Sequence, residues 1–189
     1  RLEQYEAALE TYQRILDFAK LDGYRALILH EEGATLCEAG REEEDADLFG
    51  QVLRQYPTTR TAYLSLLALD EMGSTQISDL DRGMILYYAG QYEACIKVLR
   101  HHPPSQPAHE AAQAHYYSGL AYARMEEYGQ AFKEYDLIIG HYPNDSLVAD
   151  AWISKARAEA AYGGDPSGLY HEFSRLHPDH PRAPEGLWR

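Results

Sequence analysis

The sequence has few of the residues that build disulfide frameworks or membrane spans. Its 189 residues include two cysteines, Cys37 and Cys95, which do not form a CxxC arrangement and are too few for a disulfide framework. Both lie on apolar faces of predicted helices, where a thiol behaves as a small hydrophobic group, so we expect them reduced and inert. No run of about 18 apolar residues is present, so no membrane span is predicted.

Basic residues are scarce as well, with 17 Lys and Arg against 30 Asp and Glu and a formal net charge of -13. This balance argues against a nucleic-acid or anionic-membrane surface, because both are themselves negatively charged. Among the aromatic residues, 16 are Tyr, whereas only four are Phe and two are Trp. A tyrosine buries its ring and keeps a polar tip for water or a partner.

Sequence motifs that carry chemistry are also missing. There is no Gly-rich phosphate loop, nucleophile elbow or HExxH helix. Of the nine histidines, His101 and His102 are adjacent at a predicted helix end, and His177 and His180 flank a proline without further ligands in reach. We therefore predict no catalytic residue, no metal site and no cofactor, and we expect this segment not to be an enzyme.

What the sequence does contain is a predicted helical hairpin between Ala112 and Asp145. Two apolar-periodic segments flank a short polar run at 125–127, and Pro143 closes the unit because proline cannot continue a helix. Residues three and four apart share one face of a helix. These faces hold His115, Ser118, Gly119 and Tyr122 in the first segment, and Tyr128, Ala131, Tyr135 and Ile138 in the second.

Small residues on both helices indicate a close crossing. Gly119 lets the second helix approach the first, and Ala131 meets it from the other side, so that the aromatic residues pack around the crossing. This order of small residues, aromatic residues and a final proline resembles the tetratricopeptide repeat, a helix-turn-helix unit of 34 residues. His115 stands where that pattern has Trp, which weakens the packing there without moving the register.

The same order of residue types recurs along the chain. A fixed period of this length predicts an all-α fold, a right-handed α-solenoid of repeats resembling the tetratricopeptide repeat, whereas an aromatic stripe alone would fit any bundle of amphipathic helices. The copies are Gly83, Leu86, Tyr92, Cys95, Leu99 and Pro107; then Gly33, Leu36, Phe49, Val52 and Pro57, with Ala46 one place beyond the expected small residue; and, downstream, Trp152 at the Trp position and His177-Pro178-Asp179.

These copies predict a single superhelical domain over 1–189. The distance from Pro57 to Gly83 leaves room for one inserted helix, so the alternation of first and second helices is expected to break there. Because 1–22 reads as a second helix without its first, we expect the natural protein to extend upstream. The predicted parts are a truncated repeat 1–22, repeat 24–59, inserted helix 60–75, repeats 76–109, 112–145 and 147–180, and the start of a further unit at 181–189.

A solenoid of hairpins offers a curved groove lined by its first helices, and this groove is the predicted binding site for a protein or peptide. Packing between repeats is the alternative explanation for its apolar residues. The carboxylate-clamp use that the family resemblance implies is doubtful, because the Lys and Asn positions hold His30, Leu80, Tyr116 and Ile153. The predicted groove residues are Met84, Tyr87, Tyr88, Tyr116, Leu120, Arg124, Ile153 and Arg157.

A second resemblance rests on three stretches, Asp81–Tyr92, His115–Tyr122 and Tyr142–Trp152. Together they are similar to the helical-repeat region of soluble lytic murein transglycosylases, in which a helical arm precedes a lysozyme-like domain that cleaves peptidoglycan. The resemblance implies that this chain is a non-catalytic arm that contacts peptidoglycan glycan, a partner protein or an adjacent catalytic domain. It also implies a place in the bacterial cell envelope.

The alternative is a free-standing scaffold, either an adaptor of the cytoplasm or an envelope-assembly protein. The repeats predict a protein partner in both cases. The residues themselves fix neither the compartment nor the identity of the ligand.

Overall fold

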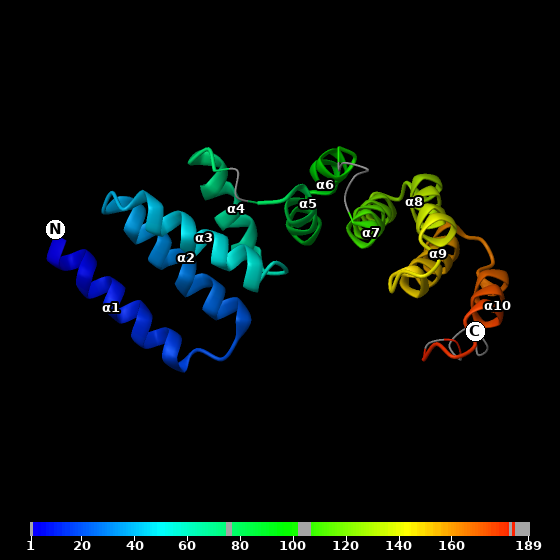
Figure 1. Cartoon of the computed structure of the whole chain (residues 1–189), viewed down its shortest axis with the longest axis horizontal. Coiled ribbons are helices and arrows are strands. Elements are labelled where there is room, and N and C mark those ends of the chain that lie inside the picture. Colours follow the sequence, from blue (N-terminus) through cyan, green and yellow to red (C-terminus); the bar gives the residue numbers. More distant parts are fainter. Residues whose placement is uncertain (1, 75–76, 102–106, 182, 184–189) are drawn as a thin grey trace. The chain divides into compact units, whose positions relative to one another are not determined.

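The computed structural model describes residues 2–74, 77–101, 107–181 and 183, and this part of the chain is helical without any β-strand (Figure 1). This confirms the predicted all-α, helical-repeat fold. The helices are α1 (Leu2–Phe18), α2 (Asp22–Glu38), α3 (Glu42–Gln55), α4 (Arg60–Glu71), α5 (Asp79–Tyr88), α6 (Tyr92–Leu99), α7 (Ala108–Arg124), α8 (Tyr128–His141), α9 (Val148–Tyr162) and α10 (Ser167–Leu176).

The chain divides into two compact units, 1–91 with α1 to α5 and 92–189 with α6 to α10. The repeat predicted at 76–109 spans this boundary and stays a prediction, as does the handedness of the superhelix. Of the further unit predicted at 181–189, residues 182 and 184–189 lie outside the described residues. No helix in the described part of the chain is both long and apolar enough to cross a membrane.

The second unit is organised around the hairpin of α7 and α8, which pack along their length. At Gly119, a Cβ atom would lie only 2.7 Å from Cε1 of Tyr135, closer than real Cβ contacts come. Tyr135 is 1% exposed and Ala131 is fully buried, so both sides of the crossing are filled. The predicted close approach at Gly119 is therefore present, and it is the glycine that permits it.

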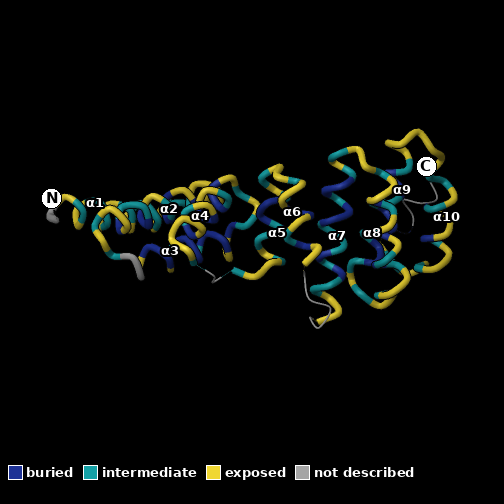
Figure 2. The backbone as a smooth tube through the Cα atoms, turned by 90° about the horizontal axis from the view of Figure 1, so that it is seen from above, coloured by how far each residue is buried: buried dark blue, intermediate teal, exposed yellow. Residues whose placement is uncertain are grey.

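The first unit repeats this geometry in the hairpin of α2 and α3. A Cβ atom at Gly33 would lie 2.9 Å from Cε1 of Phe49, which is itself 3% exposed. Phe49 follows Gly33 by the same number of residues as Tyr135 follows Gly119. In Figure 2, α2 and α3 carry buried stretches, whereas the described residues of α1 are exposed or intermediate.

Four turns between consecutive helices share one backbone conformation. The residue seven places after the packing position has a left-handed φ, which glycine adopts without the steric penalty of a Cβ atom. Three of these residues are glycines and the fourth is a glutamate: Gly40 (φ 76°), Gly90 (φ 77°), Gly163 (φ 92°) and Glu126 (φ 62°). The Glu126 turn is therefore under local strain that the other three lack.

The predicted inserted helix 60–75 is present as α4, which begins after the cap formed by Thr59, whose Oγ1 accepts the Ala62 N–H at 3.2 Å. Helix α4 packs on both α3 and α2, just as α9 packs on both α8 and α7. It therefore occupies the place of a first helix, and α5 follows it with no second helix between them. The predicted break in the alternation of first and second helices falls at this point, and the division of the chain into repeats stays a prediction.

Two helix starts illustrate the local sequence signals that begin a helix, a capping side chain and an acidic first turn. Ser78 caps α5: its Oγ accepts the Asp81 N–H at 3.1 Å and donates to Asp81 Oδ2 at 2.7 Å. Helix α2 begins at Asp22, directly before Gly23. An acidic residue in the first turn stabilises the positive end of the helix, and this outweighs the low helix propensity of Gly23.

One side chain interrupts the repeat pattern inside the first unit. Asp45 is fully buried, and both of its carboxylate oxygens lack a hydrogen-bond partner within the described residues. Its counterpart in α8, counted from Gly119, is Ala131. A buried carboxylate without a partner costs roughly several kcal/mol, so Asp45 lowers the stability of the α2–α3 hairpin.

His30 links α2 to α4 and is half-buried between them. Its Nδ1 lies 2.9 Å from Oγ of the buried Ser65, and its ring centroid lies 5.2 Å from that of Phe49. Burial lowers the pKa of His30 below its usual value, and the charge of Glu31 opposes this shift in part. The folded first unit therefore favours the neutral imidazole.

The two cysteines differ in environment, and neither forms a disulfide. Cys95 is fully buried in α6, and burial raises the pKa of its thiol to about 12, in keeping with the inert thiol expected there. The burial that its place on an apolar helix face predicts is wrong for Cys37, which is exposed. The apolar face of α2 turns inward at Leu36, and the next residue points about 100° away from it.

The strained turn at Glu126 allows a test of the left-handed position that follows Gly119 by seven residues. Replacing Glu126 by Gly is expected to raise the stability of the second unit by about 1 kcal/mol, because the left-handed conformation no longer carries a Cβ penalty. Thermal unfolding followed by circular dichroism measures this. Glu127→Gly removes the same charge one residue later, at a negative φ, and is expected to bring no gain. Equal effects of the two substitutions on the unfolding temperature would contradict the assignment of backbone strain to Glu126.

The stability of the first unit is expected to fall as the pH drops below about 6.5, where an unfolded histidine takes up its proton. The sign follows from the lowered pKa of His30: the unfolded state binds the proton more readily, so protons pull the equilibrium toward unfolding. Urea unfolding between pH 7.5 and 5 measures this. His30→Gln should reduce the pH dependence, while His171→Gln, at an exposed position of α10, serves as control. Identical pH curves for wild type and His30→Gln would rule out this contribution.

Candidate binding surfaces

The predicted groove residues of the first unit lie on one face of α5. Met84 and Tyr87 are half-buried, and Tyr88 is 46% exposed. The rings of Tyr87 and Tyr88 meet edge to face with their centroids 5.4 Å apart. This face therefore presents one accessible aromatic ring supported by a second.

In the second unit the predicted residues lie on α7 and α9, which pack against each other. Tyr116 is half-buried, its ring centroid lies 6.4 Å from that of Tyr135, and its hydroxyl lies 3.4 Å from Oγ of Ser154 in α9. Leu120 is half-buried one turn further along α7. The tyrosine thus joins the two first helices at their shared face.

The remaining predicted groove residues differ in how far their side chains are buried. Arg124 and Arg157 are exposed, so both can meet a ligand from solvent. Ile153 is only 2% exposed, since it lies beside Ser154 in the region where α9 meets α7. Its side chain belongs to the core of the second unit and offers almost no surface. Ligand binding by the other residues stays a prediction.

Sequence reasoning missed an apolar surface on the first unit. Leu64 and Leu67 of α4 are each 41% exposed and lie on one face of that helix, and Leu27 of α2 is 39% exposed. The contact between His30 and Ser65 shows that α2 and α4 are adjacent at this level. The signal was the apolar composition of 62–69, which we assigned only to an inserted helix.

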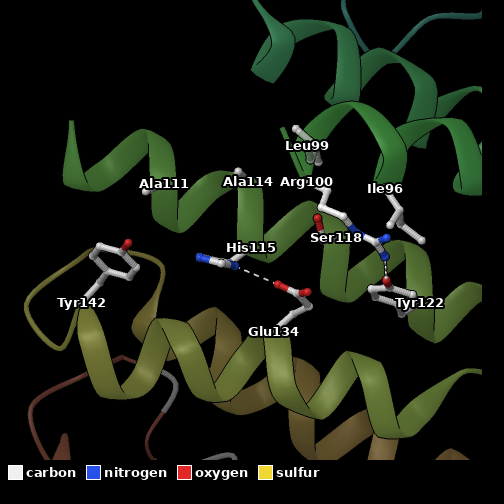
Figure 3. Close-up of a pocket in the computed structure, with 10 residues that line it drawn as sticks. All are labelled: Ile96, Leu99, Arg100, Ala111, Ala114, His115, Ser118, Tyr122, Glu134 and Tyr142. Carbon is white, nitrogen blue, oxygen red and sulfur yellow. Dashed lines mark hydrogen bonds and ion pairs between the residues drawn. The ribbon is translucent and has the colours of Figure 1, made fainter. Parts of the chain in front are cut away.

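A cavity of about 230 Å³ lies between α6, α7 and α8 of the second unit. Figure 3 shows the residues that line it. In this view Tyr142 stands at one end and Arg100 and Tyr122 at the other, with His115 and Glu134 between them. Small and aliphatic side chains make up much of the remaining wall. They are Ile96 and Leu99 of α6 and Ala111 and Ala114 of α7, with the Ser118 hydroxyl beside them.

Two polar pairs bound the cavity. His115 Nδ1 lies 2.7 Å from Oε2 of Glu134, joining α7 to α8, and Arg100 Nη2 donates to the Tyr122 hydroxyl at 2.9 Å, joining α6 to α7. His115 and Glu134 are both only partly accessible, with side-chain exposures of 32% and 23%. The cavity therefore has one polar pair at an end, a second polar pair midway along it, and an apolar wall.

The cavity groups a hydroxyl, an imidazole and a carboxylate. Ser118, His115 and Glu134 lie near one another, yet within the described residues no hydrogen bond joins the Ser118 hydroxyl to His115. A nucleophilic serine needs such a base, so the cavity holds no activated nucleophile in this arrangement. Among the residues that the structure describes, no three His, Cys, Asp or Glu side chains are grouped so as to hold a metal.

The comparisons with known proteins agree with the repeat geometry of α7 and α8. The family model of the tetratricopeptide repeat matches residues 113–145, nearly the range predicted for the repeat at 112–145. No curated protein matches the chain. The family match and the all-helical structure support a repeat protein of the tetratricopeptide type, whose repeats are generally non-catalytic and serve protein–protein interaction. They give no support to the resemblance to lytic transglycosylases.

Proposed function

We propose that this chain is a non-catalytic scaffold that binds a protein partner through the first-helix face of its second unit. The proposal rests above all on one observation: the segment that matches the tetratricopeptide repeat includes residues 113–124 of α7, and Tyr116 of this helix lies 3.4 Å from Ser154 of α9. Leu120 and Arg124 follow Tyr116 at steps of four along the same face of α7. An extended peptide that crosses these two helices would meet a ring, an aliphatic side chain and a guanidinium within one stretch.

The charges on this face favour a particular peptide chemistry. Arg124 and Arg157 are exposed on α7 and α9, in a chain whose formal net charge is -13. An arginine can bind a carboxylate through two parallel hydrogen bonds, while Tyr116 and Leu120 accept apolar side chains. The ligand that fits best is therefore a peptide with apolar residues next to Asp, Glu or a C-terminal carboxylate.

The resemblance to lytic transglycosylases implies another ligand, peptidoglycan glycan held by a helical arm. No observation on the described residues favours glycan over peptide, so peptidoglycan enters only as a competing outcome. Co-sedimentation of the chain with purified peptidoglycan distinguishes the two, because the peptide-binding proposal predicts no enrichment in the pellet.

The proposed function is tested by selecting peptides on the full chain from a displayed library and measuring their affinity by fluorescence anisotropy. Tyr116→Ala and Arg124→Ala are each expected to weaken binding about tenfold or more, which corresponds to about 1.4 kcal/mol. Arg175→Ala, at an exposed position of α10, and Tyr162→Ala, whose ring packs on Tyr128 and Phe132 of α8, are the matched controls.

Controls that weaken binding as much as the two face variants would contradict this site. Selected peptides that lack acidic groups altogether would contradict the assigned role of the arginines.

A further inference from the structure

We propose that the cavity between α6, α7 and α8 binds a tryptophan side chain of the protein partner. This inference rests on the proposed function, because it needs a protein ligand, but it concerns a different surface from the α7–α9 face. The argument starts from a comparison of two consecutive first helices within the second unit.

Helices α7 and α9 share a register that aligns His115 with Trp152. Gly119 and Ala156 are the buried small residues of the two helices, and His115 and Trp152 each stand four places before them. Trp152 is 6% exposed, so the second unit already buries an indole ring at this position of α9. In α7 a smaller imidazole takes that place, and the space beside it is the cavity.

The volume of the cavity suits an aromatic ring. It measures about 230 Å³, whereas an apolar cavity of about 150 Å³ is enough to bind benzene. Ile96, Leu99 and Ala114 are all buried and supply apolar contacts along the wall. The cavity therefore has room for the two fused rings of an indole, which gain free energy when they leave water.

The polar groups of the cavity are placed to recognise the indole N–H. Oε2 of Glu134 is taken by His115, while Oε1 has no hydrogen-bond partner within the described residues. An indole nitrogen is a donor only, and a carboxylate oxygen is an acceptor only. A hydrogen bond from the indole to Oε1 would thus satisfy both groups, which a phenylalanine ring cannot do.

The charges that line the cavity favour a neutral aromatic ligand over a charged one. The Arg100 guanidinium and the Glu134 carboxylate both line the cavity, so their charges oppose each other there. Arg100 lines the cavity and is held by its bond to the Tyr122 hydroxyl, which Figure 3 shows as a dashed line. Guanidinium groups stack on aromatic faces, and indole gives the strongest such contact.

The test uses the full chain and N-acetyl-5-fluorotryptophanamide as probe, with binding followed by ¹⁹F NMR. Saturable binding is expected for the wild type. His115→Trp fills the cavity from within, as Trp152 does in α9, and is expected to weaken probe binding at least tenfold while raising the unfolding temperature. Glu134→Gln keeps the shape and removes the charge, and a loss of about threefold to tenfold is expected. His171→Trp adds an indole at an exposed position of α10 and should leave binding unchanged.

Equal probe binding by wild type and His115→Trp would overturn the proposal, and so would equal affinity for N-acetyl-4-fluorophenylalaninamide. If His115→Trp does not fold, Ala111→Leu narrows the same cavity from a half-buried position and must give the same loss. Peptide binding at Tyr116 and Arg124 is measured in parallel. A probe that fails to bind while those peptides still bind removes only the tryptophan pocket, and loss of both removes the proposed function as well.

Discussion

The close approach of two helices at a glycine is the constraint on which both units depend. At Gly119 and at Gly33 the helices come so near that a single added carbon would overlap the ring of Tyr135 or Phe49. Each ring is buried by this contact and in turn fixes how far the second helix lies from the first. The left-handed turn residue lies a fixed number of residues after this crossing, and the next first helix packs on the hairpin that the crossing forms. The crossing therefore determines which faces of α4, α7 and α9 point outward.

Much of this architecture can be predicted from spacing, because spacing alone determines which residues share a helix face. The helical hairpin at 112–145 and a helix beginning at Arg60 are both found in this way. Side-chain volume is harder to predict. The residue His115 was recognised only as a weak packing residue, whereas the cavity beside it depends on walls that three helices contribute.

Burial was also misjudged where it depends on neighbouring elements. The exposure of Cys37 and the burial of Ile153 are both decided by which helix packs alongside, and the spacing of one helix does not contain that information. The positions where the chain departs from its own repeat are Asp45, His115 and Glu126. Asp45 and Glu126 lower stability, and His115 leaves a cavity, so His115 is the departure that offers a binding function.

The central claim is that contact between Gly119 and the ring of Tyr135 sets the register of the repeat, and a double-mutant cycle tests it most directly. Unfolding free energies would be measured for Gly119→Ala, Tyr135→Val and the double variant, with folding of each checked by circular dichroism. The account predicts that Gly119→Ala costs about 1–3 kcal/mol in the wild-type background and little or nothing once the ring is gone. A cost of Gly119→Ala that is equal in both backgrounds would contradict it.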